Sequence, residues 1–398
     1  MLLPLLAVLA LPHFDLAAHE RPRLIASAKT VIAEEPRTIV TIVNPRSAGG
    51  AHDFSSEGDY WWPDPQNPNG PYIQRDGLTN PDNFTGHRQL LLRFGRNFGI
   101  LAAAYKVTHD EQYATAAVKH LHAWFVNPDT RMNPNLLYSQ AIKGRFTGRS
   151  IGVIDSLHLA EVALGVECLR GSKALTQTEE SAVTGWFKEY LTWIRTHPYG
   201  VDESKAENNH GTCWTLQEAC FARLVGDRET LADARRRLIE IHLPGQMAPD
   251  GSFPREIART KPYGYSLFNL DVMTGLAAVL SQPGDDLMNH ALPDGRSLTK
   301  AVAFMAPHIV NKTGWLTNVH KPAKAADLTP ASRPEGELVK PDVMYWSDWP
   351  VRQPFLLFGA LSAGRDDWLD AWKQLEPDPT VEEIRRNLPI RQPVLWLP

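Results

Sequence analysis

The sequence contains little cysteine and shows no excess of charge of either sign. Its three cysteines, Cys168, Cys213 and Cys220, are an odd number without the spacing of a metal site. They therefore predict neither a disulfide framework nor a zinc centre. The 41 Lys and Arg residues nearly balance the 45 Asp and Glu residues. Because no long run of like charge is present either, nucleic acid is not an expected partner.

Long hydrophobic runs are also absent, except near the N-terminus. Residues 2–11 are apolar and have the length of a signal-peptide core, although no Lys or Arg precedes them. We predict a leader at residues 1–20 and a periplasmic or secreted protein; the alternative is a short hydrophobic segment that stays attached. No other stretch approaches the roughly 20 apolar residues of a membrane span, so no membrane partner is expected.

What the sequence does have is helical periodicity. It is present in residues 90–107, 111–125, 151–169, 176–196, 211–224, 228–242, 267–280, 297–309 and 351–361. Loops rich in Pro, Gly, Asn and Asp join these segments, and there is no series of alternating strands. The pattern predicts an all-α fold, an (α/α) toroid or barrel of helical hairpins, with one domain over residues 21–398.

Two segments, residues 44–87 and 310–347, lack this periodicity. The first contains Tyr60, Trp61 and Trp62, and a long loop with so many aromatic side chains is expected to be ordered and functional. We predict that this loop arm packs over a cleft. The chain as a whole has 12 Trp and 31 Pro, a composition typical of proteins that bind sugars, because flat indole faces stack on pyranose rings.

The segment 207–214 reads Glu-Asn-Asn-His-Gly-Thr-Cys-Trp and opens a predicted helix. Its amide and imidazole groups therefore lie beside the positive end of a helix dipole, which favours an anionic ligand. The alternative is that Asn208 or Asn209 merely caps the helix and that His210 is a neighbour with a structural role.

A second polar segment, residues 253–266, reads Phe-Pro-Arg-Glu-Ile-Ala-Arg-Thr-Lys-Pro-Tyr-Gly-Tyr-Ser. Its three cations and two tyrosines precede an apolar helix. Alone, it is also compatible with a solvated loop. Together, the two segments supply a cation and an amide to hold a carboxylate, and a phenol to move a proton beside it.

These segments resemble the alginate lyase superfamily of helical-toroid polysaccharide lyases, most closely polysaccharide lyase family thirty-eight and more distantly family five. The resemblance rests on Asn-Asn-His-Gly-Thr-x-Trp, Glu-Ile-Ala-Arg and Tyr-Ser-Leu-Phe-Asn-Leu. The earlier stretch Ser-Glu-Gly-Asp-Tyr-Trp-Trp-Pro-Asp-Pro is also similar to this group. The resemblance extends from about residue 50 to about residue 280. It implies the toroid fold and a lyase activity on an anionic polysaccharide.

Matched residue by residue, the resemblance implies that Asn209, His210, Arg259 and Tyr265 are catalytic. The interval between the arginine and the tyrosine is one residue shorter than in family five. Tyr263 therefore competes with Tyr265 for the role of the catalytic phenol.

The implied reaction is β-elimination on a 1,4-linked uronan. Asn209, His210 and Arg259 would stabilise the charge that develops on the carboxylate, while Tyr265 would take the C5 proton and return it to O4. In mannuronate and glucuronate these two positions lie on the same side of the ring, so one tyrosine suffices. Guluronate requires a second group, such as His210. We therefore predict syn elimination on poly-mannuronate or poly-glucuronate, giving 4,5-unsaturated uronate ends.

Further residues are candidates for substrate binding. They are Tyr60, Trp61, Trp62, Gln140, Arg149, Tyr263 and Arg255. The tyrosine and tryptophans of the arm would stack on sugar rings or cover the cleft, although one of the two Trp could instead hold the loop together. Gln140 and Arg149 would bind hydroxyl groups and a second carboxylate, or else satisfy backbone carbonyls. The role of Arg255 is open, because family five has an aliphatic residue there.

Two other functions remain open at this point. A glycoside hydrolase would use two carboxylates, and Asp155, Glu207, Asp250 and Glu256 are its candidates. A non-catalytic polysaccharide-binding protein would keep the cleft without turnover. No cofactor or metal is expected, because the 14 His show no His-x-x-x-His spacing or carboxylate-flanked ligand pattern.

Overall fold

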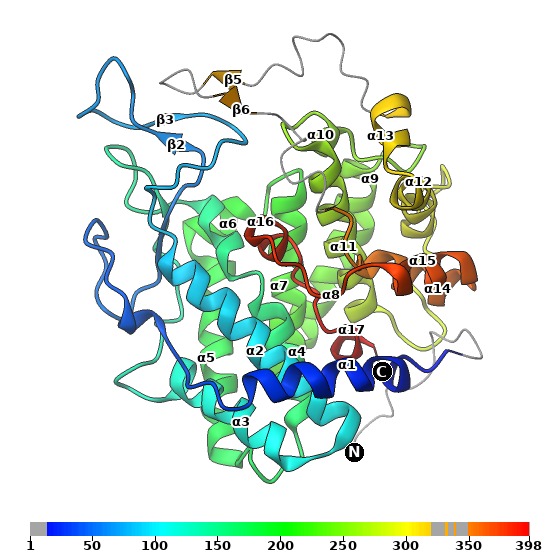
Figure 1. Ribbon diagram of the computed structural model, residues 1–398, viewed down its shortest axis with the longest axis horizontal. Coiled ribbons are helices and arrows are strands. Elements are labelled where there is room, and N and C mark those ends of the chain that lie inside the picture. Colours follow the sequence, from blue (N-terminus) through cyan, green and yellow to red (C-terminus); the bar gives the residue numbers. More distant parts are fainter. Residues whose placement is uncertain (1–13, 320–330, 333–337, 340–348, 398) are drawn as a thin grey trace.

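The inner layer of the fold consists of helices that are buried on nearly all sides. They are α2 (Gly86–Thr108), α4 (Leu159–Leu169), α7 (Asn209–Val225), α11 (Pro262–Leu280) and α14 (Pro354–Ala363). Each packs against the next in chain order. A helix without a polar face is stable only inside a core, which explains why α4, α11 and α14 lie here (Figure 1).

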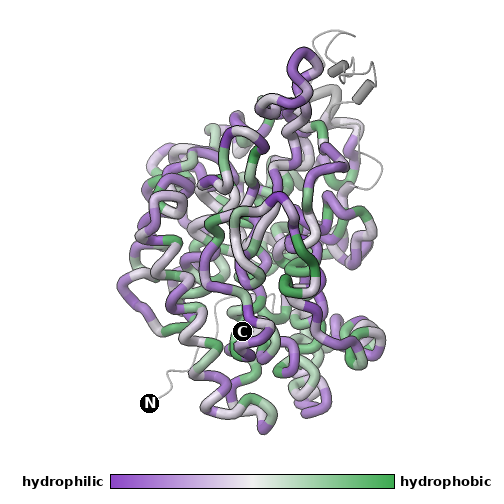
Figure 2. Tube along the Cα trace, turned by 90° about the vertical axis from the view of Figure 1, so that its left-hand side faces the viewer, coloured by the Kyte–Doolittle hydropathy of each residue, from purple (hydrophilic) through white to green (hydrophobic). Residues whose placement is uncertain are grey.

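The outer layer consists of amphipathic helices that bury one face against the inner layer. They are α1 (Leu16–Val31), α3 (Glu111–Leu121), α5 (Gln177–Thr196), α8 (Arg228–Arg237), α12 (Leu298–Val310) and α15 (Asp366–Gln374). For example, α3 packs on α2, α8 on α7, and α15 on α14. Hydrophilic stretches predominate at the outer turns (Figure 2). The predicted all-α toroid of helical hairpins is confirmed.

Shorter helical elements connect these layers. The α-helices are α6 (Pro198–Glu203), α9 (Leu243–Gln246), α10 (Pro254–Ile257), α13 (Thr313–Asn318), α16 (Glu382–Arg386) and α17 (Pro393–Trp396). The 3-10 and π turns are η1 (Ile39–Thr41), η2 (His122–Val126), η3 (Ser150–Ser156) and η4 (Leu238–His242). Near the end of the chain, α17 packs against α2, α4 and α11.

The predicted loop arm contains short strands. β1 (Ser55–Glu57) pairs in parallel with β4 (Tyr138–Ala141), while β2 (Trp61–Trp62) pairs antiparallel with β3 (Ile73–Gln74). The part of the arm with β2 and β3 extends away from the helices at the upper left of Figure 1. Another two-stranded pair joins β5 (Ala331–Ser332) and β6 (Leu338–Val339).

The structure is a computed structural model that describes residues 14–319, 331–332, 338–339 and 349–397. Within these ranges no helix is long and apolar enough to cross a bilayer. Most of the segment predicted as a leader lies outside the described residues, as does most of the irregular segment 310–347. The final residues of the predicted leader belong to α1, where Glu20 is buried and pairs with Arg23 and Arg352.

The predicted helices are present, with one correction. Residues 151–169 do not form one α-helix: residues 150–156 form the 3-10 turn η3, and α4 begins at Leu159. In η3 the backbone of Gly152 packs so closely on Ser139 that an added Cβ would lie 2.0 Å from its Oγ. This close approach to β4 fixes the path of the chain before α4.

Candidate active site

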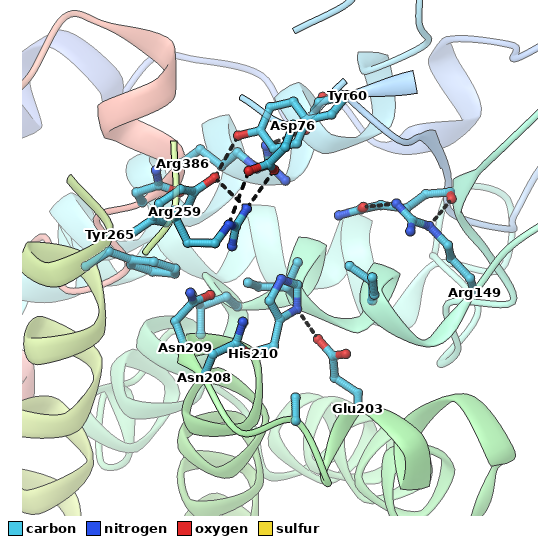
Figure 3. Close-up of a pocket in the computed structure, with 18 of the residues that line it drawn as sticks. Tyr60, Asp76, Arg149, Glu203, Asn208, Asn209, His210, Arg259, Tyr265 and Arg386 are labelled. Carbon is cyan, nitrogen blue, oxygen red and sulfur yellow. Dashed lines mark hydrogen bonds and ion pairs between the residues drawn. The ribbon is translucent and has the colours of Figure 1, made fainter. Parts of the chain in front are cut away.

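A cavity of about 430 Å³ lies where α6, α7, α11 and α16 meet the loop arm. Its walls carry Asp59, Tyr60, Trp61, Gln74, Asp76, Gln140, Arg149, Ile151, Ile154, Leu157, Glu203, Ala206, Asn208, Asn209, His210, Arg259, Tyr265, Phe268, Glu383, Arg386 and Asn387. The volume is within the usual range for a ligand pocket. Figure 3 shows Tyr265, Asn209, His210 and Arg259 around this space, with Arg149 set apart from them.

The two adjacent asparagines have different roles. Asn208 is the N-cap of α7, and its side chain accepts a hydrogen bond from the His210 N–H at 3.2 Å. Asn209 is buried, and Glu256 accepts hydrogen bonds from both its backbone N–H and its side-chain amide, each at 2.8 Å. Glu256 thus holds the Asn209 side chain at the cavity wall. The capping role belongs to Asn208, which leaves the Asn209 Oδ1 and the second amide hydrogen for other partners.

His210 is oriented by a buried carboxylate. Its Nδ1 lies 2.5 Å from Oε1 of Glu203, the last residue of α6, and Glu203 is only 3% exposed. This contact places the Nδ1 proton between the two residues, so that Nε2 is the ring nitrogen left for a ligand. Both residues line the cavity. The sequence analysis did not identify Glu203.

The phenol of Tyr265 lies beside a guanidinium and a second phenol. Its hydroxyl accepts a hydrogen bond from Arg259 at 3.3 Å and lies 2.9 Å from the Tyr60 hydroxyl. The Arg259 guanidinium is also 4.4 Å from the centroid of the Tyr265 ring. Burial raises the pKa of Tyr265 to about 12, while Arg259 acts in the opposite direction because its positive charge stabilises the phenolate.

Asp76 holds Arg259 from the other side. Arg259 donates to the two Asp76 carboxylate oxygens at 2.9 and 3.4 Å, and the Thr260 hydroxyl donates to the same carboxylate at 3.2 Å. Asp76 comes from the loop arm, so this ion pair fastens the arm to the segment between α10 and α11. The sequence analysis did not identify Asp76 as a site residue.

Gln140 and Arg149 form a connected pair on another wall. Arg149 donates to the Gln140 carbonyl at 3.0 Å and to its side-chain oxygen at 3.1 Å, while the Gln140 amide donates to Asp155 at 3.1 Å. Gln140 has a φ of +47°, a conformation that is uncommon for a residue other than glycine. Both predicted residues therefore line the cavity, and each also has a structural partner.

A buried ion cluster adjoins the cavity, and two of its members, Asp59 and Arg386, line the cavity wall. Asp59 pairs with Arg386 and with Arg88, the latter at 2.6 Å, and the same two arginines approach Asp155 at 3.8 and 3.7 Å. Burial alone would raise the pKa of Asp59, but the two arginines lower it to about 2. Arg386 lies on α16, far from every motif in the sequence, and only the fold brings it to the cavity.

Three predicted site residues lie outside the cavity walls. Trp62 points away from the space that Trp61 lines, and its Nε1 donates to the Leu78 carbonyl at 2.9 Å. Tyr263 is fully buried, and its hydroxyl donates to the His308 carbonyl at 3.0 Å. Arg255 pairs with Glu207 at an exposed position. The cavity walls therefore do not include these three side chains, and their assignment to the site stays a prediction.

The carboxylates considered for a hydrolase do not form a pair in the cavity. Asp155, Glu207, Asp250 and Glu256 are all absent from its walls. Asp155 belongs to the ion cluster, and Glu256 holds Asn209. In the part of the chain that the structure describes, no group of three or more His, Cys, Asp or Glu side chains is arranged to hold a metal ion.

Within this helical toroid the cleft combines amides, an imidazole, a guanidinium and a phenol, which are groups suited to bind an anionic substrate and to transfer a proton. The sequence model of the family described as Alginate lyase matches residues 41–315. The chain therefore belongs to the alginate lyase family and is a polysaccharide lyase by membership. No curated protein sequence matches it.

Solved structures agree with this assignment. The chain is similar to an alginate lyase from Bacteroides ovatus, with a TM-score of 0.73 and 28% identity over 94% of this chain and 93% of the other. It also shares its fold with alginate lyase A1-III from Sphingomonas species A1, with a TM-score of 0.51 and 17% identity over 88% and 86% of the two chains. A variant of A1-III complexed with a tetrasaccharide gives a TM-score of 0.52 and 17% identity over 79% and 82%.

Proposed function

We propose that the protein cleaves 1,4-linked uronans by syn β-elimination, with Tyr265 as the base and acid. The observation that carries this proposal is the contact of the Tyr265 hydroxyl with the Arg259 guanidinium in the cavity that Asn209 and His210 also line. The proton on C5 of a uronate is weakly acidic while the adjacent carboxylate is fully charged. The site therefore has to stabilise extra charge on that carboxylate and to supply a base within reach of C5.

Asn209 and His210 supply the stabilisation. Glu256 holds the Asn209 amide and Glu203 holds the His210 ring, so both groups are already oriented before substrate binds. Donors that are fixed in advance stabilise a developing oxyanion without the cost of reorganisation. They also lie at the N-terminal end of α7, where the helix dipole favours negative charge. Bound there, the uronate carboxylate accepts hydrogen bonds as charge moves onto it from C5.

Tyr265 supplies the proton transfer. Its phenolate takes the C5 proton, the C4–O4 bond breaks, and the same phenol then donates that proton to O4, leaving a C4–C5 double bond. Arg259 favours the phenolate, and the Tyr60 hydroxyl at 2.9 Å can donate a hydrogen bond to it. A single group on one face of the sugar suits the syn geometry of mannuronate and glucuronate.

Ultraviolet absorbance of the unsaturated product tests the proposal. We expect absorbance to rise with poly-mannuronate or poly-glucuronate and to be lost in the variant Tyr265→Phe. New reducing ends without absorbance would instead indicate a hydrolase. Binding of the polymer without either signal would indicate a polysaccharide-binding protein.

A further inference from the structure

A hairpin at the edge of the cavity is fastened rigidly to the loop arm. The chain reverses over residues 142–146, where Ile142 pairs with Phe146. The Tyr72 N–H donates to the Lys143 carbonyl at 3.1 Å, and Arg145 Nε donates to the Tyr72 carbonyl at 2.7 Å. At the tip, Gly144 has a φ of +73°, and a Cβ there would lie 2.9 Å from Pro71 Cα. The backbone contact therefore requires glycine and fixes the position of the hairpin.

This hairpin presents two cations to solvent. Lys143 and Arg145 are both exposed, and among the described residues neither forms an ion pair with a carboxylate. Arg259 and Arg386 inside the cavity differ, because each already pairs with an aspartate. Two cations that face solvent without a carboxylate nearby are suited to bind an anionic ligand.

Aromatic rings lie beside both cations. The Lys143 ammonium is 5.5 Å from the Tyr72 ring centroid, and the Arg145 guanidinium is 5.5 Å from that of Trp61. Phe146 is 55% exposed on the same hairpin. Cations next to partly exposed rings match the chemistry of a uronate, which has an anionic carboxylate and an apolar sugar face. We take a uronan as the ligand, in preference to a nucleic acid or an acidic peptide, because the hairpin adjoins the cavity of a polysaccharide lyase.

Trp61 connects the hairpin to the cavity. It lines the cavity wall, and Arg149, which also lines it, has its guanidinium 5.6 Å from the same ring. The cations of Arg149, Arg145 and Lys143 thus continue from the cavity to its outer edge. A cavity of about 430 Å³ holds only a short part of a polymer, so the rest of a bound chain has to leave it across the protein surface.

We propose that Lys143 and Arg145, together with Trp61 and Tyr72, form a distal uronate subsite that binds the polysaccharide beyond the sugars in the cavity. This inference rests on the proposed function, because it takes the ligand to be a uronan. The subsite increases the affinity for long chains and takes no part in the chemical step. The contribution should be electrostatic and should weaken as salt screens the exposed charges.

The variant Lys143→Gln/Arg145→Gln tests the subsite with oligouronates of increasing length and with the polymer. We expect KM for the polymer to rise by about tenfold at low salt, as two exposed ion pairs would give, with kcat unchanged. The rise in KM should be absent for oligouronates that are too short to reach the hairpin. It should also be smaller in high salt. An equal change in KM for oligouronates of every length, or an unchanged KM for the polymer, would overturn the proposal.

The matched control is Lys29→Gln/Arg228→Gln, which removes the same charge from exposed positions on α1 and α8. Arg228 follows the C-terminal end of α7, about 24 Å of helix away from Asn209. This control should leave KM as in the wild type. Because Arg145 also bonds the Tyr72 carbonyl, Lys143→Gln alone serves as a second variant that breaks no hydrogen bond, and it should give about a threefold rise.

Binding separates this inference from the proposed function. Calorimetric titration of polymer into Tyr265→Phe, with and without the hairpin substitutions, measures the subsite without turnover. If wild type cleaves no uronan, the lyase proposal fails; weaker polymer binding by the hairpin variant would still support the subsite. Equal binding by both proteins would overturn the subsite even if the enzyme is an active lyase.

Discussion

Glu203 and His210 form a buried carboxylate–imidazole pair with 2.5 Å between Oε1 and Nδ1. The pair joins the end of α6 to the first turn of α7, and both residues line the cavity. A hydrogen bond on one ring nitrogen decides which tautomer is present and which nitrogen faces a ligand. Glu203 is therefore a positioning residue that acts through His210.

The variant Glu203→Gln should keep the side-chain shape but remove the charge. We expect kcat to fall by about 10- to 100-fold, by analogy with the loss of carboxylates that orient metal-bound histidines. KM should change much less than kcat, because the lost orientation of the His210 ring affects mainly the stabilisation of charge in the transition state. Glu207→Gln, at an exposed position nearby, is the control and should change neither. An unchanged kcat would leave Glu203 with a purely structural role.

Phe substitutions at the two tyrosines near the start of α11 should have different effects on kcat. Tyr265→Phe removes the proposed base and should lower kcat by about 10²- to 10⁴-fold. Tyr263→Phe removes the hydrogen bond to the His308 carbonyl, so it should cost about 1 kcal/mol of stability and leave kcat near that of the wild type. Turnover assays and urea unfolding of both variants measure this. If Tyr263→Phe is the inactive variant, the assignment is reversed.

The rate should depend on pH through Tyr265. Its pKa of about 12 means that the phenolate fraction grows about tenfold for each pH unit in the neutral to alkaline range. We therefore expect log kcat/KM, which reports the free enzyme, to rise by about one per pH unit between pH 7 and 10. Arg259→Gln removes the charge that opposes burial, so the pKa of Tyr265 should rise and the rate at fixed pH should fall.

Arg259→Lys keeps the charge and is the control for that experiment. Its rate at pH 8 should lie between those of wild type and Arg259→Gln. A flat pH profile in the wild type would mean that no phenol has to ionise before the chemical step.

The ion cluster of Asp59 should stabilise the fold above about pH 4 and lose that effect in acid. The folded-state pKa of Asp59 is about 2, below the unfolded value of about 3.9. A depressed carboxylate pKa gives stability that is present above the unfolded value and lost as the pH falls toward the folded value, here about 2–3 kcal/mol.

The variant Asp59→Asn measures the same cluster directly. It leaves Arg88 and Arg386 without their nearest carboxylate, and we expect it to lower the free energy of unfolding by about 3–5 kcal/mol at pH 7. Urea unfolding at pH 7 and pH 3 should show a smaller difference from wild type at pH 3. An equal difference in the free energy of unfolding at both pH values would contradict this link between the pKa of Asp59 and stability.

Much of the fold could be predicted because helical periodicity and loop composition are local signals. The site residues were harder to predict where the direction of a side chain depends on the residue at which its helix or strand begins. Tyr263 and Tyr265 were ambiguous because the interval from Arg259 is one residue shorter than in family five. Helical direction could not separate them, because the helix was expected from residue 267, whereas α11 begins at Pro262. Residues two apart on a helix point in different directions, so one tyrosine faces the core and the other the cavity. Trp61 and Trp62 also point in different directions, because successive side chains on the strand β2 point to opposite faces.

The remaining site residues depend on long-range contacts. Arg386 meets Asp59 across 327 positions, and Arg259 meets Asp76 across 183. Neither Arg386 nor Glu383 belongs to a recognisable motif, so the sequence held no signal for them. Asp76 lies in the irregular segment 44–87, and only the folded arm shows that it binds Arg259.

The measurement that tests the central claim most directly is ultraviolet absorbance during incubation with poly-mannuronate, poly-glucuronate and poly-guluronate, for wild type beside Tyr265→Phe. The account predicts a rise on one or both of the first two polymers, little on poly-guluronate, and no rise with the variant. A rise that survives in Tyr265→Phe, or one confined to poly-guluronate, would contradict syn elimination by Tyr265.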